Sequence, residues 1–419
     1  MKKIFISLMI FANFSFGENL NQLIEKAINN NPQLKAYNQQ VESSKFNLEA
    51  EKQLYYPSFF TNISEIFYSK TPRMEIAPFL SFKQSNKNFT TFNIGLKYDI
   101  YTAGLRSSSI NISKYQLTSD RYLYNDTLKS LKAEVKKAYF DLMIAKALVD
   151  IYQKELENVD AHLKETEGFL EQGLVTKVEL LQAKVRKAEV ERDLRDAKGR
   201  YKVALSNLER LVGESLKNEN FEPVNIPIKD IEDIEELKKE TIQNSDKLKA
   251  LKFTLRQLQE KEKIEQSQFL PKIYTQAGYQ YTNQVDYLNP KGNFILSISA
   301  GVEFQGIKPY YKILQAKSDT KKIEYQIQDL ENNLKLLIEK AYEELKTAKD
   351  NLKVAEENLS YAKEYYELVK EQYRNQIATG TDLINAESAL TRALSSREIS
   401  YYQYLKTLAD IEYLTGKER

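Results

Sequence analysis

The most constraining feature of this sequence is a duplication that covers nearly all of it. Residues of the first half recur 214 positions later at first and 203 positions later thereafter, so the register slips once, by 11 residues. Because every shorter motif must make sense in both copies, we expect a pseudo-symmetric molecule of two structural repeats, 18–213 and 239–419, joined by a polar linker at 214–238. The recurring residues are Leu34, Ala36 and Pro57 with Leu248, Ala250 and Pro271, then Tyr139, Leu180, Ala183, Tyr201 and Gly213 with Tyr342, Leu383, Ala386, Tyr404 and Gly416.

The first 17 residues have the pattern of a secretory signal peptide. Lys2 and Lys3 precede an apolar run over 4–16, and small residues stand at Ser15 and Gly17, the −3 and −1 positions of a cleavage site. A membrane anchor is the alternative, but the run is well short of the roughly 20 residues that span a bilayer. We therefore predict a signal peptide at 1–17 and a mature chain that begins at Glu18.

Composition excludes several classes of function. The chain has no cysteine, which rules out disulfides, thiolate metal sites, cysteine nucleophiles and a lipidated cysteine. The 61 basic and 59 acidic residues give a net charge of +2, whereas nucleic-acid binding needs a basic patch or stripe. No stretch after residue 17 has the pattern of a transmembrane helix, and we expect no metal and no cofactor.

Apolar residues at alternating steps of four and three predict long coiled-coil helices in both copies. Each helix meets a short break, near 172–178 or 376–381, and a second apolar-striped helix follows. The sequence therefore predicts two long antiparallel helical hairpins, at about 106–212 and about 309–415. The stripes begin with Leu131, Val135, Ala138, Leu142 and Ala145 in the first copy, and with Leu334, Ile338, Ala341, Leu345 and Ala348 in the second.

Period-two alternation upstream of each hairpin predicts two strands per copy, at about 58–68 and 90–101, then at about 271–282 and 293–304. The 11-residue slip falls in the loop between the strands, which is long at 69–89 and short at 283–292. Strands of about ten residues match tilted transmembrane strands, but four strands cannot close a barrel. The pattern alone leaves a soluble sheet and a membrane sheet shared by several chains equally open.

Several stretches of the helices, strands and breaks described above resemble the TolC-like outer-membrane efflux protein family. The opening helix and first strand of that family are matched by Asn31-Pro32-Gln33-Leu34-Lys35-Ala36 and Leu54-Tyr55-Tyr56-Pro57. The two hairpin tips are matched by Glu171-Gln172-Gly173-Leu174-Val175-Thr176, with Glu179-Leu180-Leu181-Gln182-Ala183 after it, and by Thr379-Gly380-Thr381-Asp382-Leu383-Ile384-Asn385-Ala386. The resemblance covers essentially the whole mature chain.

The resemblance implies a mainly α fold with a membrane β-barrel. It implies a homotrimer in which twelve strands close one barrel in the outer membrane and twelve helices form a coiled-coil α-helical tunnel through the periplasm. The implied function is an exit duct for a tripartite efflux or type I secretion system, gated at the periplasmic entrance. The implied partners are a periplasmic adaptor, an inner-membrane pump of the RND, ABC or MFS type, and outer-membrane lipid. The sequence does not identify the exported cargo.

The resemblance also supplies candidate pore and gate residues. Asp382 matches a ring of acidic residues at the second tip, where three copies would favour cations. Asn385 takes the place of a second acidic ring. Glu179 and Tyr373 match a closing network whose arginine position holds Ala378, with Arg374 nearby. Candidate adaptor-docking residues are Gly173, Leu174, Val175, Thr176, Ala378, Thr379 and Gly380.

Purely structural roles account for some of the same residues. Thr176 and Glu179 have the spacing of a capping box, and Asp382 places a carboxylate in a first helical turn. The one histidine, His162, is expected on the helix surface, and with no phosphate loop or nucleophile motif we do not expect an enzyme. A periplasmic adaptor or structural coiled-coil protein is the alternative, but adaptors carry one hairpin and this chain has two.

Overall fold

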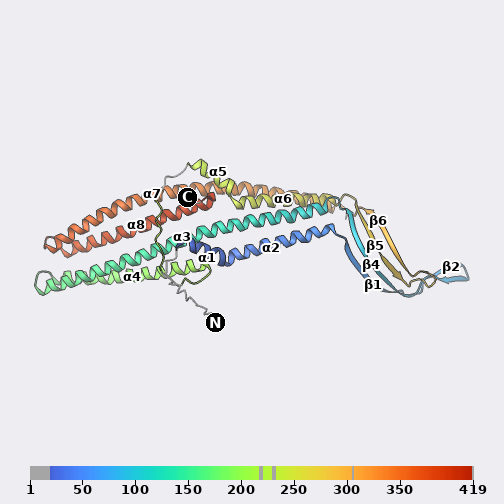
Figure 1. The fold of residues 1–419 in the computed structure, drawn as a ribbon, viewed down its shortest axis with the longest axis horizontal. Coiled ribbons are helices and arrows are strands. Elements are labelled where there is room, and N and C mark those ends of the chain that lie inside the picture. The colour runs from blue at the N-terminus through green and yellow to red at the C-terminus, as the bar shows by residue number, and fades with distance from the viewer. Residues whose placement is uncertain (1–18, 217–219, 229–232, 304–305, 418–419) are drawn as a thin grey trace, which may run out of the picture. The chain divides into compact units, whose positions relative to one another are not determined.

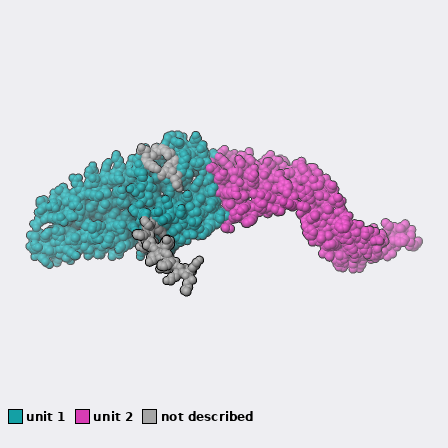
Figure 2. Space-filling model, viewed as in Figure 1, with its two compact units in different colours: residues 1–38, 124–246, 330–419 teal, residues 39–123, 247–329 magenta. Residues whose placement is uncertain are grey.

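The computed structural model describes residues 19–216, 220–228, 233–303 and 306–417. The chain divides into two compact units, shown in Figure 2. Unit 1 comprises 1–38, 124–246 and 330–419, and unit 2 comprises 39–123 and 247–329. The predicted signal peptide at 1–17 lies outside the described residues.

Helices and strands follow one another in the same order in both halves of the chain, except that the first half also contains a 3-10 turn and a short additional hairpin (Figure 1). The first half contains α1 (Leu20–Asn30), α2 (Pro32–Lys52), a 3-10 turn η1 (Gln53–Tyr55), β1 (Ser58–Phe67), β2 (Arg73–Ala77), β3 (Leu80–Lys83), β4 (Asn88–Tyr101), α3 (Leu105–Glu171) and α4 (Lys177–Val212). The second half contains α5 (Ile234–Asn244), α6 (Asp246–Ser267), β5 (Lys272–Thr282), β6 (Gly292–Gly301), α7 (Lys308–Arg374) and α8 (Gly380–Thr415).

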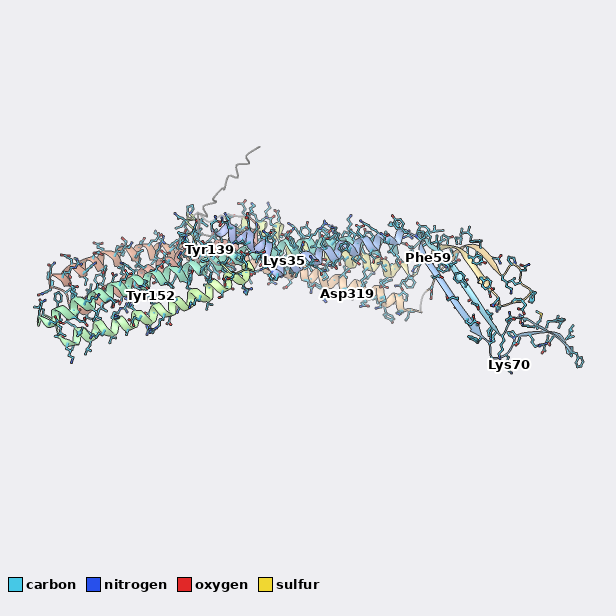
Figure 3. The ribbon with its side chains drawn as sticks, turned by 60° about the horizontal axis from the view of Figure 1, so that its bottom comes forward. Lys35, Phe59, Lys70, Tyr139, Tyr152 and Asp319 are labelled. Carbon is cyan, nitrogen blue, oxygen red and sulfur yellow. The ribbon has the colours of Figure 1, made fainter. Side chains whose placement is uncertain are left out.

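The long helices of the two halves have equal lengths. Both α3 and α7 contain 67 residues, and both α4 and α8 contain 36. In unit 1 they pack around an apolar core in which Tyr139, labelled in Figure 3, is fully buried and donates a hydrogen bond to the Glu222 carbonyl. The core also contains Leu23, Leu34, Val135, Leu142, Leu208, Leu237, Ile338, Leu352, Tyr404 and Ile411. Among the described residues, none of the helices is both long and apolar enough to cross a membrane.

The opening helix of each copy, expected as one helix, is in two pieces. In the first copy Asn31 closes α1, and its side-chain Oδ1 accepts hydrogen bonds from the backbone N–H groups of Gln33 and Leu34. Pro32 follows at the first position of α2, where its missing N–H costs nothing. In the second copy Ser245 separates α5 from α6. The linker expected at 214–238 is also shorter than predicted, because α5 begins at Ile234.

Unit 2 contains a four-stranded antiparallel sheet in the order β1-β4-β5-β6. Because alternate residues of a strand point to opposite faces, the register assigns a row of apolar residues to one face and a row of amides to the other. The apolar row is Phe59, Leu96, Ala277 and Leu296, and the amide row is Asn62, Asn93, Gln280 and Asn293. Gly95 and Gly278 lie opposite each other on the amide face.

The segment at 69–89, expected as a loop, contains a hairpin of β2 and β3. Four- and five-residue strands are too short to give a clear alternation, which is why the sequence did not reveal them. Met74 pairs with Phe82 and Ala77 with Leu80, while Arg73 pairs with Lys83 on the other face. The last strand ends at Gly301 rather than near 304, and residues 304 and 305 lie outside the described part of the chain.

Candidate functional site

The tips of the two hairpins end their first helices in the same way. At the first tip the Leu174 N–H donates to the Phe169 carbonyl and the Gly173 N–H donates to the Leu170 carbonyl, each at 2.9 Å. At the second tip, 203 positions later, Ile377 and Gln376 donate to the corresponding carbonyls at 2.8 and 2.9 Å. This is the Schellman arrangement, in which one left-handed residue reverses the chain. That residue is Gly173 at the first tip and Gln376 at the second.

Threonines cap the helices that return from the tips. Thr176 accepts a hydrogen bond from the Glu179 N–H at the start of α4, and Thr379 accepts one from the Asp382 N–H at the start of α8. Only the second cap is a complete capping box, because Asp382 Oδ2 accepts from the Thr379 backbone N–H at 2.9 Å and from its hydroxyl at 2.7 Å. These hydrogen bonds hold the pKa of Asp382 below its usual value, so the exposed carboxylate stays ionised.

Tyr373 is buried near the end of α7, and His162 of α3 packs against it. The two rings lie edge to face with their centroids 5.1 Å apart, and His162 is only 5% exposed. The expectation of a surface histidine is therefore wrong, because α7 covers a flank of α3 that the heptad pattern leaves to solvent. The Tyr373 hydroxyl lies 3.5 Å from the Thr166 hydroxyl, and Phe169 completes the aromatic contact.

Burial sets the protonation states of these two rings. It lowers the pKa of His162, so the imidazole is neutral near pH 7, and it raises the pKa of Tyr373, so the phenol keeps its proton. His162 Nδ1 has no hydrogen-bond partner among the described residues. Glu179, Tyr373 and His162 converge on Gly380, because a Cβ at Gly380 would lie 3.6 to 3.9 Å from all three side chains.

The structure brings some of the expected gate residues together and leaves others apart. Glu179 and Tyr373 lie on either side of Gly380, whereas the side chain of Arg374 is exposed and forms no ion pair within the described part of the chain. Asn385 is exposed one turn after Asp382. Within the described residues no group of three or more acidic or histidine side chains could hold a metal ion.

The expected docking residues present mainly backbone and apolar side chains. Leu174 is exposed at the first tip and Ile377 at the second, while Val175 and Ala378 are half-buried. Gly173, Thr176 and Thr379 are exposed, and Gly380 is buried. At the tips a side-chain hydrogen bond from the Thr381 hydroxyl to Gln182, at 3.2 Å, also joins the hairpins.

Sequence reasoning missed a buried polar cluster above the tips. Glu155 of α3, Arg186 of α4 and Glu387 of α8 lie together, and Glu155 and Arg186 form an ion pair. Glu387 lies four residues after Leu383 and three before Leu390, so it occupies the apolar face of α8. A carboxylate in line with the apolar residues of a helix is the sequence signal that could have revealed this cluster.

The fold matches solved outer-membrane channels. The Campylobacter jejuni CmeC outer membrane channel is 19% identical, with a TM-score of 0.81 over 95% of this chain and 86% of that chain. The outer membrane protein VceC of Vibrio cholerae is 14% identical, with a TM-score of 0.77 over 95% of this chain and 96% of that chain. The open state of the Neisseria gonorrhoeae MtrE outer membrane channel is 16% identical, with a TM-score of 0.77 over 95% and 89%. A comparison with curated protein sequences gives no match.

The duplicated hairpins and the four-stranded sheet give this chain the fold of these solved proteins. Residues 23–214 and 237–417 match the outer membrane efflux protein family, and the chain belongs to that family. It is an exit duct of the outer membrane that extends into the periplasm.

Proposed function

We propose that three copies of this chain form the duct and that it passes cargo without catalysing a reaction. The observation that carries the proposal is the sheet, in which β1 and β6 each pair on one side only within the described residues. An open sheet edge exposes unpaired backbone N–H and C=O groups, which a membrane does not tolerate. Pairing of β1 in one copy with β6 in the next satisfies both edges and closes a sheet of twelve strands.

The two faces of the sheet support this closure. Phe59, Leu96, Phe294, Leu296 and Ile298 are exposed on one face. Burying these side chains against lipid would stabilise the protein by about 25 cal/mol for each Å² of apolar area that is removed from water. The opposite face carries the amide row, which suits a passage filled with water. We propose that the apolar face contacts outer-membrane lipid and that the amide face lines the duct.

Exposed apolar stripes on the helices support the same assembly. On α4 Val178, Leu181 and Val185 are exposed at steps of three and four, the spacing of one helical face. On α7 Tyr361, Tyr365 and Leu368 show the same kind of spacing near the other tip. We propose that the α7 stripe of one copy packs against the α4 stripe of the next, so that the coiled-coil tunnel closes around the threefold axis.

We further propose that the tips form the periplasmic entrance. A periplasmic adaptor would contact the exposed apolar tip residues Leu174 and Ile377, and an inner-membrane pump of the RND, ABC or MFS type would load the cargo. Three Asp382 carboxylates would form an acidic ring, with Asn385 as a neutral ring one turn away. Glu179 and Tyr373 would hold the closed entrance from within one chain. Arg374, which has no ion-pair partner within the described residues, would reach a neighbouring copy.

The test is the mass and conductance of the mature protein extracted from outer membranes in detergent. We expect a trimer by light scattering and discrete conductance steps in a planar lipid bilayer. Leu181→Asp should reduce the trimer fraction, because it places three charges in the proposed helix interface. The matched control is Lys198→Asp, at an exposed position on another side of the same helix. A monomer that forms no channel would contradict the proposal.

A further inference from the structure

A cavity of about 330 Å³ lies between the two hairpins, within unit 1. Its walls come from α3, α7 and α8, and they include the aromatic ring of Tyr366. The carboxylates of Glu155 and Glu387 also line it, together with Ile151, Leu390 and Leu394. Two buried carboxylates beside apolar walls are unusual, because burying a charge is costly unless a partner compensates for it.

Glu155 has such partners and ties three helices together. Arg186 of α4 forms an ion pair with it, and the Thr391 hydroxyl of α8 donates a hydrogen bond to it. Glu155 is 4% exposed, so this contact is well shielded from water. The contact therefore joins the first hairpin, α3 and α4, to the second hairpin.

Glu387 forms no ion pair among the described residues. It is 6% exposed, it lines the cavity, and its Oε2 has no hydrogen-bond partner among the described residues. Glu155 lies close enough to repel its charged form. Arg186 attracts that form, but its two Nη atoms are engaged by Glu155 and by Glu189, at 3.2 Å from the latter, while its Nε has no hydrogen-bond partner among the described residues.

We propose that Glu387 is a proton-binding site that controls the contact between the two hairpins. With its proton, the Glu387 carboxyl is neutral and the hairpins pack closely around the cavity. Without its proton, a charge is buried beside Glu155, and the packing loosens until water or a base reaches Oε2. This inference rests on the proposed function only where it concerns the entrance, since separation of the hairpins would widen the tips.

The direction of the effect follows from the environment of Glu387. Burial, and then the charge of Glu155, raise its pKa from 4.5 to about 7. A carboxyl whose pKa is higher in the packed state binds its proton more tightly there, so acid favours packing. Close packing around the cavity should therefore be complete near pH 5 and should weaken as the pH rises through 7.

Other ionisable groups around the cavity leave this direction unchanged. Lys370 of α7 attracts the charged form of Glu387 and lies 5.1 Å from the centre of the Tyr366 ring. On α3, Asp150 and Lys154 also line the cavity, and Lys154 forms an ion pair with Glu157 at 2.9 Å. On α4, Arg186 is the charged group that bears on Glu387. The raised pKa of Glu387 is the result with Glu155, Arg186 and Lys370 acting on it together.

The test is the distance between the hairpins as a function of pH. Because the chain has no cysteine, two labels can be introduced without removing any native thiol. Lys164→Cys on α3 and Arg392→Cys on α8 lie at exposed positions of the two hairpins. Spin labels at these sites, in protein co-expressed with an excess of unlabelled chain, report the distance by pulsed electron resonance.

With His162→Phe in the labelled chain, which removes the opposite pH response of the tips, we expect a narrow distance distribution at pH 5.5 and a broader one with a longer mean at pH 8.5, with a midpoint near 7. Glu387→Gln, which stays neutral, should remain narrow at both pH values. The control Glu364→Gln removes an exposed carboxylate of α7 and should behave like the parent. If Glu387→Gln does not assemble, Glu387→Met carries the same expectation.

A parent chain whose distances do not change with pH would overturn the proposal. A Glu387→Gln variant that keeps the parent's pH response would overturn it as well. The measurement needs only the folded chain in detergent, so it does not depend on channel formation. Failure of the proposed function would appear as a monomer without conductance, which is a separate result.

Discussion

Gly173 and Gln376 occupy equivalent places in the two hairpin tips and share a left-handed backbone, with φ of +73° and +57°. Each donates its N–H to the carbonyl three residues earlier, at 2.9 Å. Glycine adopts this conformation readily, whereas a residue with a Cβ is strained by about 1–2 kcal/mol. The two copies thus keep the same turn, although the second copy has Gln376 at the position where glycine is less strained.

The two tips should respond oppositely to exchange of these residues. Gly173→Gln should destabilise the first turn by about 1 kcal/mol, and the amide of Leu174 should therefore exchange roughly fivefold faster. Gln376→Gly should relieve strain and slow exchange at Ile377, by a smaller factor because glycine also gains entropy in the open chain. Hydrogen exchange followed by mass spectrometry measures both. Equal responses at the two tips would contradict the assignment.

Acid should loosen the contact between His162 and Tyr373. The pKa of His162 is lowered by burial, so the closed tip favours the neutral imidazole and loses stability as the pH falls below about 6.5. This is the opposite sense to Glu387. His162→Phe keeps an aromatic ring against Tyr373 and removes the only histidine of the chain.

Amide exchange around Thr166, corrected for the intrinsic effect of pH, should rise between pH 7.5 and 5.5 in the parent and stay level in His162→Phe. Tyr373→Leu, which keeps the histidine but removes the ring over it, serves as the control and should exchange faster at both pH values. A variant without histidine that still loosens in acid would exclude His162 as the cause.

Neutralising Asp382 should reduce cation selectivity. Its pKa is held low by the hydrogen bonds from Thr379, so in a trimer it carries three negative charges at any pH near neutrality. Asp382→Asn should shift the reversal potential in a salt gradient towards zero. Glu179→Gln changes the equivalent position of the first tip and serves as the matched comparison. An unchanged reversal potential in Asp382→Asn would leave Asp382 with a capping role only.

Gly278 should be essential for assembly of the sheet. A Cβ at Gly278 would lie 2.4 Å from the Ile94 carbonyl oxygen and 2.9 Å from the Gly95 Cα, so β4 and β5 would have to separate. Gly278→Ala should therefore reduce the amount of trimer recovered from outer membranes. Gly301→Ala is the control, because nothing lies within 4 Å of a Cβ there. Equal recovery of the two variants would show that the strands adapt.

The sequence predicted most of the fold because its periodicities are long. Sustained heptads mark α3 and α7, and alternation marks β4 and β6, so no tertiary information was needed. The β2–β3 hairpin escaped because its strands are short. His162 escaped because its burial depends on Tyr373, which lies 211 positions away and shares no local pattern with it. Glu387 escaped because a single carboxylate on an apolar face is easily taken for a solvated one.

The amide row of the sheet bears on whether the duct distinguishes cargo by the sign of its charge. In the proposed trimer, Asn62, Asn93, Gln280 and Asn293 would give the passage hydrogen-bonding groups and no fixed charge within this row. Such a row would treat anions and cations alike, so discrimination by sign would depend on charged residues elsewhere, among them Lys97 and Asp99 on the same face and the proposed ring of Asp382. A change in the charge of the cargo would then require substitutions at those charged positions, whereas the amide row could stay as it is.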